Sequence, residues 1–225
     1  IKYGADLIKT CSTGGVLSKG TKVGAPQYTV EELTALIDEA HSRGLKVASH
    51  AHGAEGIINA LIAGADTIEH ASFIDDEGIR LAIENDAALS MDIYVTEYIL
   101  GEGASAGILE ESLEKERMTG ATQRSNFRKA VKAGATIVYG TDAGVYPHGQ
   151  NAKQLSRMTR FGMTPLQALQ SATTVAAKVM GLGYEVGKIE AGYAADFVAV
   201  EGNPIEQIEL LEAPSAVIKG GVRYR

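Results

Sequence analysis

The sequence has few of the features that mark secreted, membrane or nucleic-acid-binding proteins. Its single cysteine, Cys11, excludes an intrachain disulfide framework and a zinc site built only from cysteines. No apolar run approaches the roughly 20 residues that a membrane-spanning helix needs. Acidic side chains outnumber basic ones by 28 to 21, which gives a net charge of −7. We therefore expect neither a nucleic acid nor a membrane as partner.

What is present fits a folded globular unit. Of the 225 residues, 45% are hydrophobic and 22% are charged, so the chain can bury a core. Glycine is unusually frequent, with 26 residues or about 12%, against a typical ~7%. The chain begins at Ile1, without an initiator methionine or a targeting segment, and enters a predicted strand within a few residues.

One short phrase recurs along the chain. It begins with glycine, continues as an apolar or β-branched run and ends on a residue that can bind a metal or carry a proton. The four copies are GADLIK (4–9), GLKVASH (44–50), GADTIEH (64–70) and GATIVYGTD (134–142), and a weaker fifth copy is NDAALSMDIY (85–94). Glycine suits the turn that follows a helix, and the apolar runs predict strands.

Helical patterns separate these strands. Thr29 resembles an N-cap, and an apolar stripe at helical spacing follows it. Further helices are expected at 54–63, 75–84, 110–133, 151–160 and 164–180, the last with Pro165 in its first turn. The alternation of strand and helix predicts an α/β protein with a parallel sheet. After residue 181 a turn-rich segment, a strand and a hairpin around Gly220 and Gly221 predict a small β unit.

The ends of the predicted strands carry the chemistry. The four copies end on Lys9, His50, His70 and Asp142. Imidazoles and carboxylates are zinc ligands, and a carboxylate beside a metal can accept and return a proton. A lysine fits such a site only as an anionic carbamate that can bridge two ions. Each residue alone has an ordinary structural explanation, but their joint appearance at one point of a repeated phrase favours a metal site.

The remaining histidines have different expected roles. His41 lies at a helix end, where a cation complements the dipole, so we interpret it as structural. His52 follows His50 in the next loop, and we expect it to contact substrate or to support a ligand. His148 lies in a loop beyond Asp142, where a substrate contact and plain solvent exposure are equally compatible with the sequence.

The ordered motifs resemble the amidohydrolase superfamily of metal-dependent hydrolases. The segments DLIKTCSTGG (6–15), VASHAHG (47–53), IEH (68–70) and YGTDAG (139–144) resemble its motifs on strands 4, 5, 6 and 8. TTVAAKVMGL (173–182) and GKIEAGYAAD (187–196) resemble its C-terminal signature. The phrases HAHG (50–53), TGG (13–15) and ASFIDD (71–76) resemble the branch of zinc-dependent Xaa-Arg/Lys dipeptidases, also called arginine carboxypeptidase or prolidase.

The resemblance implies a metallo-hydrolase that cleaves the C–N bond of a dipeptide or N-acyl amino acid with a basic C-terminal residue. It implies that Lys9 is carboxylated and bridges two zinc ions, and that His50 and His70 complete the second metal. Asp142 would contact a metal-activated hydroxide, take its proton and protonate the leaving amine. Substrate contacts are predicted for His52, Tyr94 and His148.

One departure from the family pattern is informative. The family places a His-x-His pair on strand 1, whereas the only such pair here, His50 and His52, occupies the strand 5 position. We therefore expect residues 1–182 to form strands 4–8 of a (β/α)8 TIM barrel with their helices, and residues 183–225 to form the C-terminal part of a small β-sandwich domain. Five strands cannot close an eight-stranded barrel, so the missing N-terminal segment is an expected partner. We also expect a cytoplasmic homo-oligomer.

Other functions remain open at this point. The same centre could hydrolyse a cyclic amide, as imidazolonepropionase does, or a lactone or ester. A third interpretation is a catalytically incomplete fragment that associates with a partner supplying strands 1–3. Alone, such a fragment is expected to aggregate through the open edges of its sheet.

Overall fold

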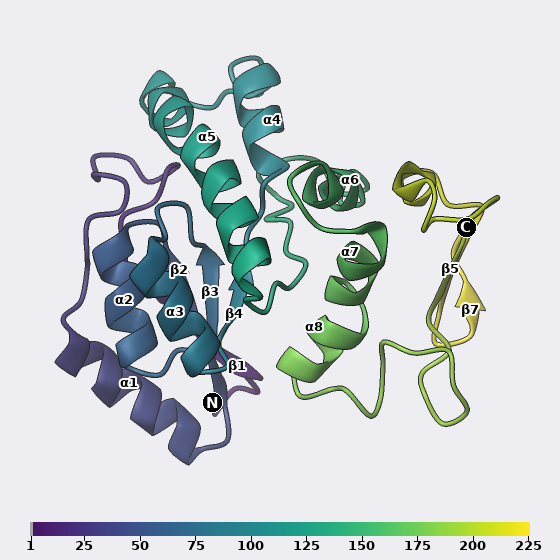
Figure 1. Cartoon of the computed structure of the whole chain (residues 1–225), viewed down its shortest axis with the longest axis horizontal. Helices are drawn as coiled ribbons and strands as arrows, with labels where there is room; N and C mark the ends of the chain where they lie inside the picture. Colours follow the sequence, from purple (N-terminus) through teal and green to yellow (C-terminus); the bar gives the residue numbers. More distant parts are fainter. Residues whose placement is uncertain (1) are drawn as a thin grey trace.

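The computed structural model describes residues 2–225 and contains two separate sheets (Figure 1). The first sheet has the order β1-β2-β3-β4, with β1 at Leu7–Cys11, β2 at Lys46–Ala51, β3 at Thr67–His70 and β4 at Ala88–Ser90. All three pairings are parallel. The expectation of an α/β protein with a parallel sheet is confirmed.

Three helices cover one face of this sheet (Figure 1): α1 at Val30–Ser42, α2 at Ala54–Ile62 and α3 at Asp76–Glu84. The side chain of Thr29 accepts from the Glu32 backbone and that of Glu32 accepts from the Thr29 backbone, so the predicted cap is a full capping box. Asp75 caps α3 in a similar way. The apolar stripes of the helices meet the sheet in one core that includes Leu33, Ile37, Val47, Ile57, Ile68 and Leu89.

The two faces of the sheet differ in burial. In β1, Thr10 is buried and Ile8 is half-buried on the face toward the helices, whereas Leu7, Lys9 and Cys11 on the other face are exposed. Parallel sheets in globular proteins are usually covered on both faces. Among residues 2–225, β1 also pairs on one side only, with β2. The sheet is therefore open along this face and this edge.

The fourth copy of the repeated phrase does not form the full strand that the sequence predicts. It pairs with β4 through a single parallel bridge, Leu89 with Ile137. Leu89 N donates to Thr136 O at 2.8 Å, and Val138 N donates to Leu89 O at 3.0 Å. The next amide, Tyr139 N, donates to Ser171 O instead, so the chain leaves the ladder after two bonds. The sheet does not close into a barrel within the described residues.

The helices after β4 confirm most of the predicted pattern and correct part of it. A helix not expected from the sequence, α4 at Val95–Gly101, precedes α5 at Glu110–Ala133, and α6 spans Lys153–Arg160. The single helix predicted for 164–180 is two helices, α7 at Pro165–Ser171 and α8 at Thr174–Val179. Thr173 leaves helical geometry between them, with φ −129° and ψ −96°. The Ser171 carbonyl accepts from Tyr139 rather than from the next helical turn, which explains the break.

The C-terminal part forms the second, antiparallel sheet, in the order β5-β6-β7. Its strands are β5 at Phe197–Ala199, β6 at Ala216–Lys219 and β7 at Val222–Arg223, with the 3-10 helix η1 at Ile208–Glu212 between the first two. The predicted hairpin is confirmed, because Lys219 pairs with Val222 around Gly220 and Gly221, both at positive φ. Glu212 of η1 accepts from Ser156 of α6 at 2.7 Å and so joins η1 to the main body.

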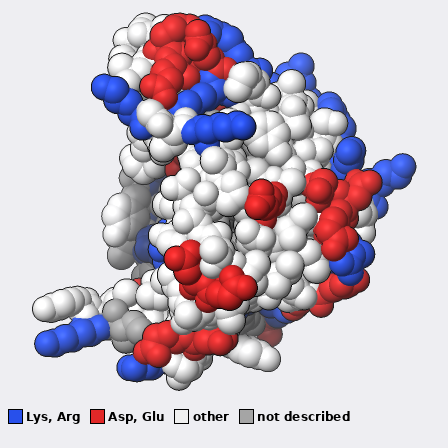
Figure 2. All heavy atoms as spheres, turned by 90° about the vertical axis from the view of Figure 1, so that its left-hand side faces the viewer, with Lys and Arg blue, Asp and Glu red and all other residues white. Residues whose placement is uncertain are grey.

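Charged side chains of both signs lie next to each other on the face shown in Figure 2, around a largely uncharged centre. Among residues 2–225, no helix combines the length and the apolar character needed to cross a lipid bilayer.

Candidate metal centre

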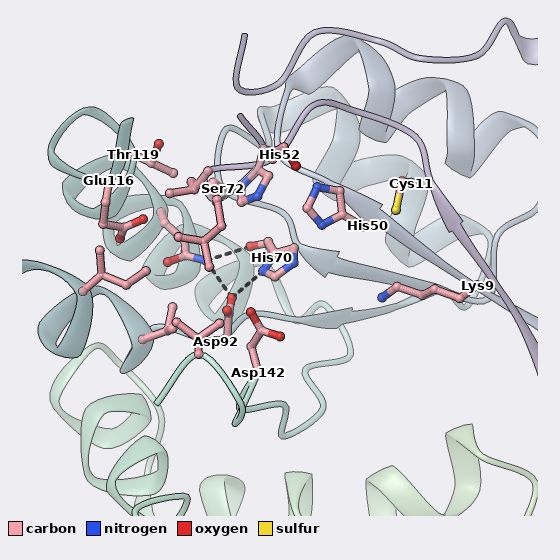
Figure 3. A pocket seen from close by; sticks show the side chains of 18 residues that line it. Lys9, Cys11, His50, His52, His70, Ser72, Asp92, Glu116, Thr119 and Asp142 are labelled. Carbon is pink, nitrogen blue, oxygen red and sulfur yellow. Dashed lines mark hydrogen bonds and ion pairs between the residues drawn. The ribbon is translucent and has the colours of Figure 1, made fainter. Parts of the chain in front are cut away.

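The carboxyl ends of the parallel strands meet at one cavity of about 240 Å³ (Figure 3). His50 comes from β2, His70 ends β3, and His52 follows β2 in the loop that leads to α2. Residues from distant parts of the chain complete the lining, and the polar or charged ones among them are Lys9, Cys11, Ser18, Ser72, Asp92, Glu116, Thr119, Gln123 and Asp142. Strand ends therefore supply one side of the cavity, and α5 supplies another.

Three imidazole rings are gathered in this cavity. The ring centroids of His50, His52 and His70 are 4.7–4.8 Å apart, and His52 and His70 are stacked with an interplanar angle of 11°. Their ligand atoms lie within 4.8 Å of one another, and the same limit holds for His70, Asp92 and Asp142. Imidazole nitrogens and carboxylate oxygens are the usual non-sulfur donors to zinc. The donor set fits a metal centre of one or two ions.

His70 is held in place by hydrogen bonds. Its Nδ1 lies 2.9 Å from Asp92 Oδ1, which leaves Nε2 free for a ligand. Gln123 Nε2 donates to Asp92 Oδ1 and to the His70 carbonyl, both at 3.1 Å. Metal-binding histidines usually have such a carboxylate partner on the second ring nitrogen. Asp92 Oδ2 is buried and has no hydrogen-bond partner among the described residues 2–225, so this oxygen can still accept a hydrogen bond or bind a cation.

His52 is fixed in a comparable way. Its Nδ1 lies 2.8 Å from Ser72 Oγ, and its backbone amide donates to Thr13 Oγ1 at 2.9 Å. Asn126 of α5 donates to the Ser72 carbonyl at 3.0 Å and so supports the residue that holds the ring. The ring nitrogen not bound to Ser72 remains available at the cavity.

The backbone at the site is strained at two predicted ligands. His70 has φ 68° and Asp142 has φ 51°, and Ala71, next to His70, has φ 47°. Residues with a Cβ rarely adopt this region, and the cost is on the order of 1–3 kcal/mol each. Hydrogen bonds from Ala71 N to Ala51 O and Glu69 O hold the turn after β3. Such strain is typical of functional sites, where contacts with the surrounding structure hold the backbone in an unfavourable conformation.

Gly15 brings backbone against the ring of His50. A Cβ at this position would lie 3.0 Å from His50 Cε1 and 3.1 Å from Nε2, closer than ordinary contacts. Glycine at position 15 therefore lets the backbone approach the imidazole closely. A larger residue at position 15 would push the ring out of place.

Comparisons with known proteins agree with this geometry. The profile of the Amidohydrolase family matches residues 1–223. The chain belongs to the amidohydrolase family. Ochratoxinase from Aspergillus niger is 34% identical over 230 aligned positions, which cover all of this chain and 47% of ochratoxinase. The chain thus spans about half the length of the curated relatives it matches first.

Two solved structures of similar proteins extend the comparison. The crystal structure of a Xaa-Pro dipeptidase with methionine bound in its active site superposes with a TM-score of 0.94 and 42% identity, covering all of this chain and 55% of that one. A prolidase complexed with N-methylphosphonate-L-proline gives a TM-score of 0.93 at 28% identity, covering all of this chain and 56% of that one. The resemblance to the amidohydrolase superfamily is confirmed, and the finer placement among Xaa-Arg/Lys dipeptidases stays a prediction.

Electrostatics in this amidohydrolase cavity favour the neutral form of two of the three imidazoles, His50 and His52. Burial, together with the nearby charges of His70 and Lys9, lowers the pKa of His50 to about 4. Burial and the neighbouring His70 and His50 lower the pKa of His52 as well. His70 differs: burial disfavours its charged form, but the Asp92 carboxylate outweighs this and raises its pKa. Neutral imidazole is the form that binds a metal, so His50 and His52 need lose no proton near neutral pH.

Five of the seven site residues predicted from the sequence line the cavity: Lys9, His50, His52, His70 and Asp142. The structure does not bring the other two there. Tyr94 is buried beside it, where its hydroxyl donates to Gln150 Oε1 at 2.8 Å and its ring meets that of Tyr146 at 5.0 Å. His148 lies exposed in the loop after Tyr146.

Sequence reasoning missed Asp92, Gln123 and Glu116. Asp92 lies in the weak fifth copy of the repeated phrase, two residues beyond β4, at the point where the other copies carry their ligands. This position in the repeated phrase could have identified Asp92 as a site residue. Glu116 and Gln123 lie on α5, seven residues apart and therefore on one helix face, but nothing local shows that this face lines a cavity.

Proposed function

We propose that the full-length protein containing this chain is a metal-dependent hydrolase that cleaves the amide bond of a dipeptide or N-acyl amino acid with a basic C-terminal residue. The observation that carries the proposal is the convergence of His50, His52, His70, Asp92 and Asp142, whose ligand atoms form two groups within 4.8 Å around one cavity. Membership of the amidohydrolase family supports the reaction class.

In this proposal Lys9, His50, His70 and Asp142 hold two zinc ions. Lys9 extends toward the histidines from the Cys11 side of the cavity (Figure 3). Addition of carbon dioxide to its Nζ, with loss of a proton, would give an anionic carbamate whose oxygens could bind metal. Bound zinc would lower the pKa of a water molecule toward ~7 and polarise the scissile carbonyl. Asp92 orients His70 through Nδ1.

Asp142 is proposed as the proton carrier. It lies in the loop after the 136–138 segment, and its carboxylate is within 4.8 Å of ligand atoms of His70 and Asp92. In amide hydrolysis the attacking water must lose a proton and the leaving amine must gain one. A carboxylate at this place can accept the first proton and deliver it to the amine nitrogen, which balances the reaction.

The chain supplies only part of the site in this proposal. Residues 1–182 would form the last five units of a (β/α)8 barrel, and residues 183–225 would form part of a small β domain. The single-sided pairing of β1 and the exposure of Lys9 and Cys11 support an N-terminal segment that covers this face. That segment would bring the remaining ligands of the first metal.

The test uses the full-length protein purified with zinc and bicarbonate. Zinc content and hydrolysis are measured on Met-Arg, Met-Lys, Met-Pro, N-acetyl-arginine amides and a cyclic amide. We expect zinc binding and cleavage of the open-chain substrates, with preference for Arg and Lys. Preference for the cyclic amide would replace this proposal by the cyclic amidase alternative, and the absence of bound metal would contradict it altogether.

A pair of variants tests the bridging lysine. Lys9→Ala is expected to lose zinc and activity together, and retention of activity would contradict the carbamate assignment. His41→Gln is the matched control, because His41 pairs with Asp66 at the opposite end of the sheet. It should keep the zinc content and the turnover of the wild type.

A further inference from the structure

One face of α5 closes the cavity with polar side chains. Glu116, Thr119 and Gln123 lie on it at helical spacing, and all three line the cavity (Figure 3). The helix comes close because residue 120 is glycine: a Cβ there would lie 2.3 Å from Thr96 Cγ2 of α4. Close packing of α5 on α4 therefore places Glu116 at the cavity wall.

Glu116 is a buried carboxylate without a cation. Its exposed fraction is 3%, and none of the ion pairs among residues 2–225 includes it. The basic residues nearest along α5 are engaged elsewhere. Lys115 donates to Glu111 at 2.7 Å and to Ser18 O at 2.8 Å, and Arg124 pairs with Glu97 at 3.5 Å. A buried charge without a partner costs free energy, so a positive group that binds beside Glu116 would stabilise its ionised carboxylate.

The surroundings of Glu116 favour its neutral form when no cation is bound. Burial, and to a lesser degree the Asp92 carboxylate, raise the pKa of Glu116 to about 7, although the Thr96 hydroxyl and the charges of Arg124 and His70 act in the opposite direction. The ionised form is therefore disfavoured until a positive group arrives. Apolar side chains line the same cavity, namely Val16, Leu17, Val95, Ile99 and Val145. An aliphatic stem can pack on such a surface while its charged end reaches a carboxylate.

We propose that Glu116 is the specificity residue that binds the cationic group of the substrate, an alkylammonium or guanidinium. The site lies across the histidine cluster from Lys9 (Figure 3), so a substrate bound there would place its amide bond between the two. This inference rests on the proposed amide hydrolysis and names Glu116 as the residue that recognises the cation of the substrate. The cation has two possible sources, the basic side chain or the free α-amine, and one experiment separates them.

Equilibrium binding to the full-length, zinc-loaded protein provides a test that does not depend on turnover. Calorimetry with L-lysine and L-norleucine measures the contribution of the side-chain ammonium, and L-norleucine against N-acetyl-L-norleucine measures that of the α-amine. Wild type is expected to prefer one cationic ligand over its neutral analogue by about 10- to 100-fold, as for a charged hydrogen bond. Glu116→Gln keeps the side-chain volume and should abolish that preference.

Two further variants separate recognition from folding. Glu116→Asp retains the charge and should recover part of the preference, and Glu114→Gln, on an exposed position of α5, should retain all of it. Zinc content should stay unchanged in all three. Equal preference in wild type and Glu116→Gln, or equal weakening of cationic and neutral ligands, would overturn the proposal. If wild type binds the cation selectively yet cleaves no amide, the proposed function fails while this inference stands.

Turnover adds a second measurement. For a substrate whose cation reaches Glu116, Glu116→Gln should raise KM by about 10- to 100-fold with a smaller change in kcat. For the neutral analogue, the same substitution should change KM by less than about twofold. A loss confined to kcat would place Glu116 in the chemistry rather than in recognition.

Discussion

Strand β3 has a histidine–aspartate pair at each end, and the two pairs differ in what they leave free. Before the strand, Asp66 lies 2.8 Å from His41 Nε2. At its carboxyl end, His70 lies 2.9 Å from Asp92 Oδ1. The distances are nearly equal, but the side chains of His41 and Asp66 are 41% and 19% exposed, against 15% and 5% for His70 and Asp92. The first pair stabilises the fold, whereas the second can help to bind a metal ion.

The Asp66 pair is complete. The carboxylate accepts from Val47 N at 2.7 Å and from Lys46 Nζ at 3.0 Å in addition to His41. Partial burial favours the protonated acid, but the hydrogen bonds from Val47 and His41, with Lys46, hold the pKa of Asp66 below its usual value. Both carboxylate oxygens therefore accept hydrogen bonds from within the chain. In parallel α/β proteins the amino ends of the strands typically serve stability in this way.

The Asp92 pair is incomplete. Asp92 Oδ2 has no hydrogen-bond partner among residues 2–225, and the backbone of His70 is left-handed. A second carboxylate, Asp142, lies within the same group of potential ligands. Burial and the Asp92 charge raise the pKa of Asp142. Each of these features costs stability, and together they form a site in which an added cation would satisfy several groups at once.

The largest effect is expected at Asp142. Asp142→Asn keeps the shape of the side chain but removes its capacity to carry a proton. We expect kcat of the full-length protein to fall by roughly 10²–10⁴-fold, the range for loss of general acid–base catalysis. Steady-state kinetics on a dipeptide substrate measure it, and unchanged turnover would remove the proton-carrier role.

Asp92→Asn tests the incomplete pair directly. The amide can no longer hold the His70 ring as a carboxylate does, so zinc affinity or activity should fall by about 10- to 100-fold. Titration with a chelator gives the affinity independently of turnover. If zinc binds as tightly as in wild type, Asp92 does not support a ligand, and the contrast between the two ends of β3 weakens.

Asp66→Asn is the matching change at the complete pair. Loss of the charge weakens the contacts with His41 and Lys46, and we expect the free energy of unfolding to fall by about 1 kcal/mol with zinc content and kcat unchanged. Thermal unfolding and metal analysis check the two halves of this prediction. If Asp66→Asn lost as much activity as Asp92→Asn, the two histidine–aspartate pairs would not differ in function as we expect.

The smallest effect concerns pH. Because the pKa of Asp66 is lower in the folded than in the unfolded protein, its contribution is present above the unfolded value near ~3.9 and is lost as the pH falls through the folded value. The stability difference between wild type and Asp66→Asn should therefore be full at pH 7 and shrink below about pH 4. Urea unfolding at several pH values measures it; a constant difference would contradict the assignment.

Features set by nearby residues could be predicted from the sequence. The repeated phrase predicted the parallel strands and placed His50 and His70 at their ends, and Thr29 and Thr164 marked helix starts that the structure confirms. Features that depend on distant partners could not be predicted. The break in the 164–180 helix follows from a hydrogen bond with Tyr139, and Glu116 reaches the cavity only because α5 packs on α4 at Gly120.

Tyr94 illustrates the same limit. It was expected at the end of a strand and therefore at the site, but β4 ends at Ser90 and Tyr94 directly precedes α4. There its ring packs with Tyr146 in a small cluster of its own. The strand was four residues shorter than its pattern indicated, which was enough to turn the side chain away from the cavity.

The short length of β3 limits where insertions and deletions can be tolerated in this sequence. The strand is four residues long, with Asp66 just before it and His70 as its last residue. Because side chains alternate between faces, one residue inserted or deleted within β3 would misplace either Asp66 or His70, whichever end kept its register with β2. The connection between α4 and α5 is exposed at 104–107 and pairs with no strand among the described residues. Insertions and deletions among descendants of this sequence should therefore accumulate between α4 and α5 and be absent from β3.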